Sequence, residues 1–420
     1  MFSTWGALIG LAVAIVLIVR KVAPAYALVF GALVGGLLGG GGLSGTVAAM
    51  VSGTQSMMPS VLRILSSGVL VGALVKTGSA EKIADAIVAA LGQRFALAAV
   101  ALATMVVTAV GVFVDIAVIT VAPVALAVGR RVGISVPALL LAMIGGGKAG
   151  NVISPNPNTI AVAEAFKLDL TSVMLANVVP AAVALLVTVL ISAWLAKRWT
   201  RCETSFVGSD AATCGGRLPS ALQAAAGPLA VVALLALRPA FGIVVDPLVA
   251  LPAGGIVSIV ACGRWKETVA YSEYGLSKVV GVSILLVGTG TVAGIVKGSG
   301  LNADMISLLH ACNMPAWALA PLSSLLLSGA TASTTAGVTI ASQTFAGAFA
   351  EAGVPALSAA AMLHAGGTIF DALPHGSFFH ATAGAVGMGV KDRLKLFPLG
   401  EIVGLVTTLV SVAVHALWGC

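Results

Sequence analysis

The chain has 420 residues, of which 59% are hydrophobic and only 9% are charged. An ordinary soluble domain carries about 25% charged residues, so this composition excludes a cytosolic enzyme, a nucleic-acid-binding protein and a disordered chain. The net charge of +7 requires no acidic partner, because Lys and Arg collect in the cytoplasmic loops of membrane proteins. We therefore expect an all-α polytopic membrane protein that is surrounded by the lipid bilayer.

The first half of the chain, residues 1–199, contains the apolar runs that membrane spans require. Helical spans are expected at 5–19, 23–42, 59–75 and 172–195. Residues 76–94 are amphipathic and are expected to lie at the membrane interface. The run 95–129 is short for two full spans, which indicates a re-entrant hairpin with its tip near 108–115. The run 136–166 is interrupted by Gly, Pro and Asn residues and predicts a broken helix.

Residues 200–217 form the longest polar segment and are expected to be a cytoplasmic linker. The second half, residues 218–420, repeats the pattern of the first. Helical spans are expected at 218–237, 247–262, 279–296 and 396–418. A second hairpin is expected at 316–350 with its tip at 329–337, and a second broken helix at 354–387.

The two halves align at an offset of 220 residues, with the sequence that starts at Gly133 matching the sequence that starts at Gly353. The alignment places Lys148 on Thr368, Asn151 on Asp371 and Asp115 on Thr335. Chance similarity between Ala-, Gly- and Leu-rich segments is the alternative. Interruptions that fall at the same place in both halves favour a duplication instead.

The distribution of charge suggests the topology. An N-terminus outside the membrane gives five crossings in the first half, and an odd number of crossings inverts the second half. We therefore predict two inverted repeats, each with five crossings, one broken helix and one re-entrant hairpin. Most Lys and Arg residues, including Lys278 and Arg393, then fall in cytoplasmic loops, and few, such as Arg63, fall outside. Both termini are expected outside a bacterial inner membrane.

The four interruptions are expected to form the binding site. Unwound backbone at membrane depth is tolerated where it lines a cavity or is buried in protein, and secondary transporters build their midplane sites in this way. The N-terminal ends of half-helices attract anions. The candidate substrate-binding residues are Lys148, Asn151, Ser154, Asn156, Asn158, Thr159, Ser333, Thr334, Thr335 and His375. The alternative is that Gly and Pro only kink packed helices.

Three ionisable residues carry specific expectations. Lys148 is the only cation placed deep in the membrane, where a charge is costly and usually functional. It could bind a substrate carboxylate, or form a structural ion pair with Asp115 or Asp371. Asp371 is the preferred proton carrier, with helix capping as the alternative. Asp115 and His375 are further candidates for proton coupling, and Asp115 could also bind Na⁺.

The two breaks resemble the gluconate permease (GntP) family of carboxylate:proton symporters. The resemblance is carried by GGGKAGNVISPNPNTIAVAEAF at 145–166 and FDALPHGSFFHATAG at 370–384. After His375 the chain continues Gly-Ser-Phe-Phe, where the family often has Asn-Gly. The resemblance implies a permease fold and a gluconate-like substrate.

We therefore expect a secondary active transporter that moves a small organic anion, a sugar acid or hydroxy acid, together with protons by alternating access. No ATP-binding motif is recognisable, so an ion gradient is expected to drive it without a cofactor. No His or Cys cluster has metal-ligand spacing, and no metal is expected. A Na⁺-coupled carboxylate transporter is the main alternative, and an intramembrane enzyme is a remote one. A homodimer is the assembly we consider, and no nucleic acid is expected as a partner.

Overall fold

The computed structural model describes residues 2–20, 22–199, 218–301, 304, 307, 315–374 and 376–418. Within these ranges the regular structure is helical, apart from an isolated bridge between Phe2 and Ser299. The expected linker, 200–217, and the candidate residue His375 lie outside the described residues. An all-helical chain with several long apolar helices is the architecture of a polytopic membrane protein.

The helices of the first half follow the expected elements, with one addition. They are α1 (Thr4–Val19), α2 (Pro24–Leu38), α3 (Gly42–Ser56), α4 (Met58–Lys76), α5 (Ser79–Leu91), α6 (Ala96–Ala109), α7 (Val114–Val132), α8 (Val136–Asn151), α9 (Pro157–Ala165), α10 (Leu170–Ala176) and α11 (Val178–Arg198). The tip between α6 and α7 falls inside the expected range 108–115. Helix α3 was not predicted, because its Gly, Ser, Thr and Gln residues give it no long apolar run.

The helices of the second half recur in similar order. They are α12 (Ala221–Phe241), α13 (Pro247–Ala261), α14 (Thr268–Lys297), α16 (Leu319–Thr331), α17 (Thr334–Glu351), α18 (Ala356–Gly366), α19 (Ser377–Ala385) and α20 (Val390–Trp418). Helix α14 begins well before the expected span at 279–296. The assignment of Lys278 to a cytoplasmic loop is therefore wrong, because the residue lies within this helix.

Four helices within the described residues are long and apolar enough to cross a membrane on their own: Met58–Lys76, Val178–Arg198, Trp265–Lys297 and Val390–His415. The pair Ser79–Leu91 and Gln93–Ala109 also qualifies when taken together, although it is bent by 107°. Several other apolar helices are shorter than a full span. The number of crossings in each half therefore stays a prediction.

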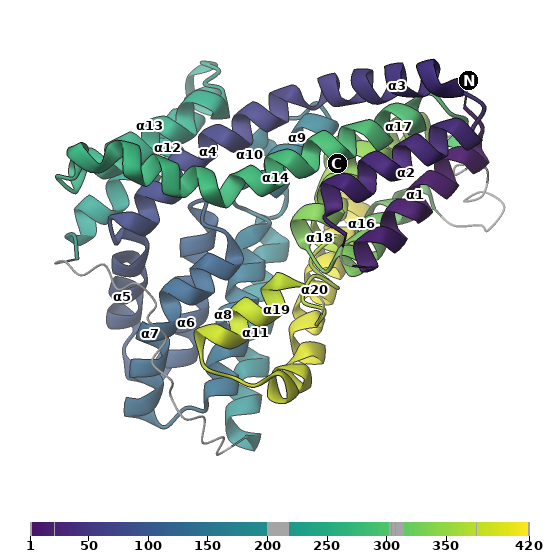
Figure 1. The fold of residues 1–420 in the computed structure, drawn as a ribbon. Coiled ribbons are helices and arrows are strands. Elements are labelled where there is room, and N and C mark those ends of the chain that lie inside the picture. Colours follow the sequence, from purple (N-terminus) through teal and green to yellow (C-terminus); the bar gives the residue numbers. More distant parts are fainter. Residues whose placement is uncertain are drawn as a thin grey trace.

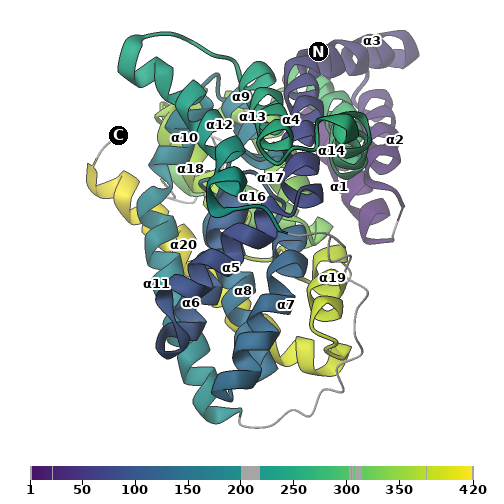
Figure 2. The same ribbon diagram turned by 90° about the vertical axis from the view of Figure 1, so that its left-hand side faces the viewer.

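Helices α3 and α4 lie lengthwise against α14 across the top of the molecule, above a group of more upright helices that includes α5–α8 and α11 (Figure 1; Figure 2). Gly53 of α3 faces Gly290 of α14, and Gly72 of α4 faces Gly275. The residue number falls along α14 as it rises along α3 and α4, so the paired helices run antiparallel. Their glycines allow the backbones to approach closely.

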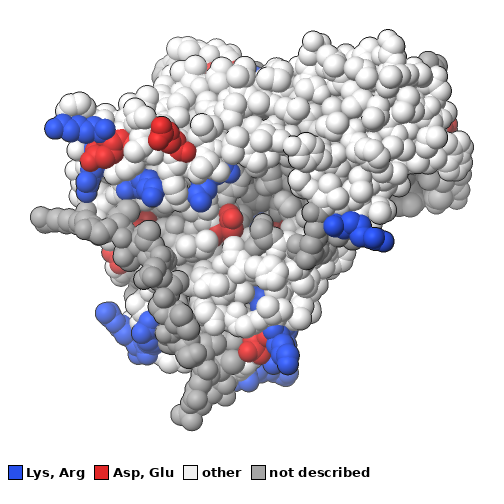
Figure 3. Space-filling view, in the orientation of Figure 1, with Lys and Arg blue, Asp and Glu red and all other residues white. Residues whose placement is uncertain are grey.

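Helix α8 occupies the centre of the molecule, and all of its residues are buried. It packs against α6, α7, α11 and α20. Over α1–α3, by contrast, the surface in Figure 3 is almost free of charged side chains, as a lipid-facing surface should be. The first broken helix, formed by α8 and α9, thus lies inside the protein, where unwound backbone can be tolerated.

Candidate functional site

Four interruptions of the helices meet at one cavity of about 950 Å³. Two are hairpin tips, between α6 and α7 and between α16 and α17, and two are breaks, between α8 and α9 and between α18 and α19. The residues that line the cavity from these places are Phe113, Val114, Asp115, Asn151, Asn158, Thr331, Ala332, Ser333, Thr334, Thr335, Ala336, Asp371, Pro374, Gly376 and Phe378. The N-terminal ends of α7, α9, α17 and α19 therefore border the same space. A hollow with charged side chains at its edge is visible below α14 (Figure 3).

Hydrogen bonds among polar side chains hold the first break. Asn156 caps α9, and its Oδ1 accepts from the amides of Asn158 and Thr159 at 2.9 and 3.1 Å. Its Nδ2 donates to the carbonyl and side-chain oxygens of Asn151 at 2.9 and 2.6 Å. The Thr159 hydroxyl donates to the carbonyl of Ser154 at 2.6 Å, and the Ser154 hydroxyl donates to a carbonyl of α6 at 2.7 Å. These bonds satisfy backbone groups that unwinding would otherwise leave buried without partners.

Asn151 and Asn158 are the members of this network that line the cavity. Asn158 Nδ2 donates to Asn151 Oδ1 at 3.1 Å, while Asn158 Oδ1 has no hydrogen-bond partner among the described residues. Ser154, Asn156 and Thr159 lie behind them and hold the shape of the break. The first break therefore offers a ligand amide groups and a helix N-terminus.

The hairpin tips turn sharply and begin two helices that point at the cavity. Gly111 at the first tip has φ +111°, and Ala332 at the second has φ +47°, a conformation that favours glycine. Ser333 caps α17, since its Oγ accepts from the amide of Ala336 at 3.3 Å. Asp115 Oδ1 similarly accepts an amide hydrogen bond in the first turn of α7, at 2.9 Å.

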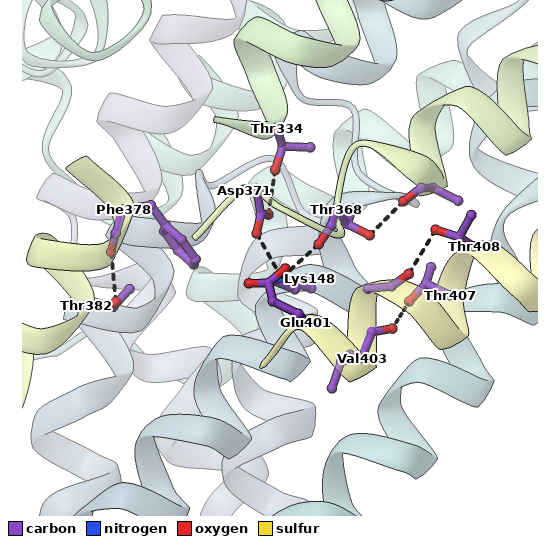
Figure 4. Close-up of polar contacts among 12 residues, drawn as sticks. Lys148, Thr334, Thr368, Asp371, Phe378, Thr382, Glu401, Val403, Thr407 and Thr408 are labelled. Atoms are coloured by element: carbon purple, nitrogen blue, oxygen red, sulfur yellow. Dashed lines mark hydrogen bonds and ion pairs between the residues drawn. The ribbon is translucent and has the colours of Figure 1, made fainter. Parts of the chain in front are cut away.

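A cluster of charges adjoins the cavity at Asp371, and Figure 4 shows the contacts within this cluster. The Lys148 ammonium is 2.8 Å from Asp371 Oδ1 and 3.5 Å from Glu401 Oε2, and it donates to the carbonyl of Thr368 at 2.7 Å. Asp371 Oδ2 accepts from the hydroxyl of Thr334 at 2.6 Å. Asp371 therefore joins the cavity, the tip of the second hairpin and the buried cation.

Two members of this cluster were not predicted from the sequence. Glu401 projects from α20, and its Oε1 has no hydrogen-bond partner among the described residues. Glu401 could have been identified from the sequence, because it is an acidic residue inside the expected span at 396–418. Arg393 is only 1% exposed, so its assignment to a cytoplasmic loop is wrong: α20 begins at Val390 and carries it into the protein. Its guanidinium carbon lies 5.0 Å from the ring centre of Phe379.

The structure brings most of the candidate residues to one place. The candidates that line the cavity are Asp115, Asn151, Asn158, Ser333, Thr334, Thr335 and Asp371. Lys148 is 1% exposed and lies behind Asp371 in the ion pair that was the alternative expectation. His380 also lines the cavity, and its Nε2 lies 2.8 Å from the carbonyl oxygen of Pro374.

A second charge cluster lies outside this cavity. Arg63 of α4 pairs with Glu164 at the end of α9 and, at 2.8 Å, with Asp246 at the start of α13. The hydrogen bond from Arg63 holds the pKa of the Asp246 carboxyl below its usual value. This cluster connects the two halves of the chain and has the character of a structural bridge.

The comparisons with known proteins agree on a class. A family model described as GntP family permease matches residues 4–418. A Haemophilus influenzae protein called an uncharacterized transporter is 50% identical over 417 residues, which cover 99% of each chain. A second Haemophilus influenzae protein, called an uncharacterized permease, is 29% identical over 46% of this chain and 40% of its own length. The fold is similar to the crystal structure of the Alcanivorax borkumensis YdaH transporter, with a TM-score of 0.67, 16% identity, and 90% and 89% of the two chains covered.

Proposed function

The chain belongs to the GntP family of permeases and is a membrane transporter, not an enzyme, and from that premise we propose that it carries a small organic anion together with protons. The anion is a gluconate-like sugar acid or another hydroxy acid. Transport is driven by the proton gradient and requires no cofactor.

The observation that supports an anionic substrate is the convergence of four helix N-termini on one cavity. Each N-terminus presents the positive end of a helix dipole, which favours an anion. The hydroxyls and amides of Ser333, Thr335 and Asn158 around these ends suit a substrate that carries hydroxyl groups as well as a carboxylate.

The charge cluster supports proton coupling. Lys148, Arg393, Asp371 and Glu401 are together neutral when all four are ionised. A proton on Asp371 leaves the cluster with one net positive charge, because Lys148 and Arg393 are then balanced by Glu401 alone. An anion in the adjacent cavity restores neutrality. Binding of the proton therefore favours binding of the anion, and the two travel together.

We also propose that the chain consists of two inverted repeats, 1–199 and 218–420, that are joined by a cytoplasmic linker. Lys148 donates to the carbonyl of Thr368, the residue 220 positions away that aligns with it. Contact between equivalent residues is what a two-fold axis through the site produces. The antiparallel pairing of α4 with α14 follows the same symmetry. In this topology both termini lie outside a bacterial inner membrane.

A sodium ion is the second candidate for the coupled cation. Asn158 and Asp115 line the same cavity, and Asn158 Oδ1 is buried without a hydrogen-bond partner among the described residues. A sodium ion would be held by oxygen atoms of this kind. The uptake experiment that tests proton coupling also tests this candidate, with a Na⁺ gradient in place of the pH gradient.

Uptake into proteoliposomes tests the proposal. The purified protein is given gluconate, glycerate or lactate, with either a pH gradient or a Na⁺ gradient imposed. We expect one or more of these acids to accumulate when the pH gradient alone is present. Accumulation that follows the Na⁺ gradient alone would favour the second candidate. Failure to bind or carry any of the acids would reject a hydroxy-acid substrate.

A further inference from the structure

Lys278 is a cation of the cavity wall that lies apart from the charge cluster. It projects from α14, faces the interruptions across the cavity and is exposed there. Apolar residues exposed on the same helix, such as Leu276 and Val280, indicate that this part of α14 otherwise meets lipid or protein. A lysine in such a position is costly unless it faces water or an anion.

Lys148 is unsuited to hold the carboxylate of a substrate, although it is a cation near the cavity. It is 1% exposed, and two carboxylates and a carbonyl already surround its ammonium group. Lys278 has no such partners in the cluster. Its ammonium lies 4.9 Å from the ring centre of Tyr274, on the preceding turn, and this contact steadies the side chain without neutralising it.

Asp115 is an acidic group that lines the same cavity as Lys278. It stands at the tip of the first hairpin, and its carboxylate has the charge opposite to that of the Lys278 ammonium. The two residues come from different parts of the molecule, α7 and α14, with the cavity between them. An anion that enters the cavity would thus compete with Asp115 for the same cation.

We propose that Lys278 is the residue that binds the carboxylate of the transported acid, in place of Asp115. The hydroxyl groups of the substrate then face Ser333 and Thr335 at the second hairpin tip. In this arrangement Lys278 of α14 contacts the carboxylate, and the second hairpin tip contacts the hydroxyl groups. This inference rests on the proposed function, and it assigns to Lys278 the preference for an acid over its neutral amide.

The test compares binding of gluconate, glycerate and lactate with binding of their amides, by calorimetry on the purified protein. A hydrogen bond to a charged group contributes substantially to binding affinity. Lys278→Met should therefore reduce the ratio of acid affinity to amide affinity by roughly 10- to 100-fold. Affinity for the amide should change little. Lys278→Arg should retain most of the preference, and Lys266→Met, near the start of the same helix, should retain all of it.

A second variant tests the competition with Asp115. Asp115→Asn should tighten binding of the acid by at least about threefold, because it frees Lys278, and should have no such effect in the Lys278→Met background. An unchanged preference for the acid in a folded Lys278→Met protein would overturn the inference. If the unaltered protein prefers no acid to its amide, the proposed anionic substrate itself is wrong and the inference falls with it.

Discussion

Replacement of Lys148 by Met removes the cation on which the buried cluster depends. Asp371 and Glu401 lie 2.8 and 3.5 Å from its ammonium group, and both are almost fully buried. Without Lys148 the cluster has a net negative charge, and Arg393 is the remaining cation. Loss of one partner from a buried ion pair typically costs about 3–5 kcal/mol of the free energy of unfolding. We expect Lys148→Met to lower the free energy of unfolding by an amount in this range.

The control is Lys297→Met, which removes an exposed lysine in the last turn of α14. Substitutions of exposed residues usually change stability by less than about 0.5 kcal/mol. Both variants can be unfolded in mixed detergent micelles and followed by circular dichroism. Equal stability of the two variants would show that Lys148 is not held by its buried partners.

The double variant Lys148→Met, Asp371→Asn gives the sharper comparison. It removes one charge of each sign and leaves Glu401 with Arg393, so the cluster is neutral again. We therefore expect the double variant to be more stable than the sum of the two single changes predicts. A purely additive result would refute the view that these residues act as one electrostatic unit.

Three further predictions concern packing, topology and pH. Gly72→Ala places a Cβ against the backbone of α14 and should cost about 1–3 kcal/mol of stability, whereas Gly45→Ala meets open space and should be neutral or slightly stabilising in thermal unfolding. In a cysteine-free background, a cysteine at Ser209 should be shielded from an impermeant thiol reagent outside whole cells and one at Asp169 should react; labelling of both would break the proposed topology. The lowered pKa of Asp246 means that its bridge stabilises the protein above the ordinary carboxyl pKa of 3.8 and is lost as the pH falls through the lowered value. The stability difference from Asp246→Asn should therefore be constant near neutral pH and disappear in acid; a difference that persists in acid would contradict this.

The positions of the interruptions could be predicted from the sequence because Gly, Pro and Asn mark them locally. The first hairpin tip, the two breaks and the polar residues around Asn151 were located in this way, since a break in an apolar run needs no knowledge of distant residues. The class of protein followed from composition and from the motifs of the two breaks. These features are encoded within short stretches of the chain.

The partners of the charges could not be predicted in the same way. Lys148 meets Glu401 across 253 positions of sequence, and only the packing of α8 against α20 brings them together. Lys278 and Arg393 were misplaced for a different reason: helices α14 and α20 begin earlier than their apolar runs do. The polar N-terminal turns of such a helix resemble a loop in the sequence, although in the folded protein Lys278 lines a cavity and Arg393 is buried.

Proton coupling through Asp371 is tested most directly by measuring proton movement during transport. Proteoliposomes that contain a pH-sensitive dye are given whichever of gluconate, glycerate or lactate the protein binds, first with the unaltered protein and then with Asp371→Asn. We expect uptake by the unaltered protein to acidify the lumen. The Asp371→Asn protein should still bind the acid, because Asn resembles the protonated carboxyl, but should lose accumulation driven by a pH gradient. Continued pH-driven accumulation by Asp371→Asn would contradict the role of Asp371 as the proton carrier and would assign the proton to another residue.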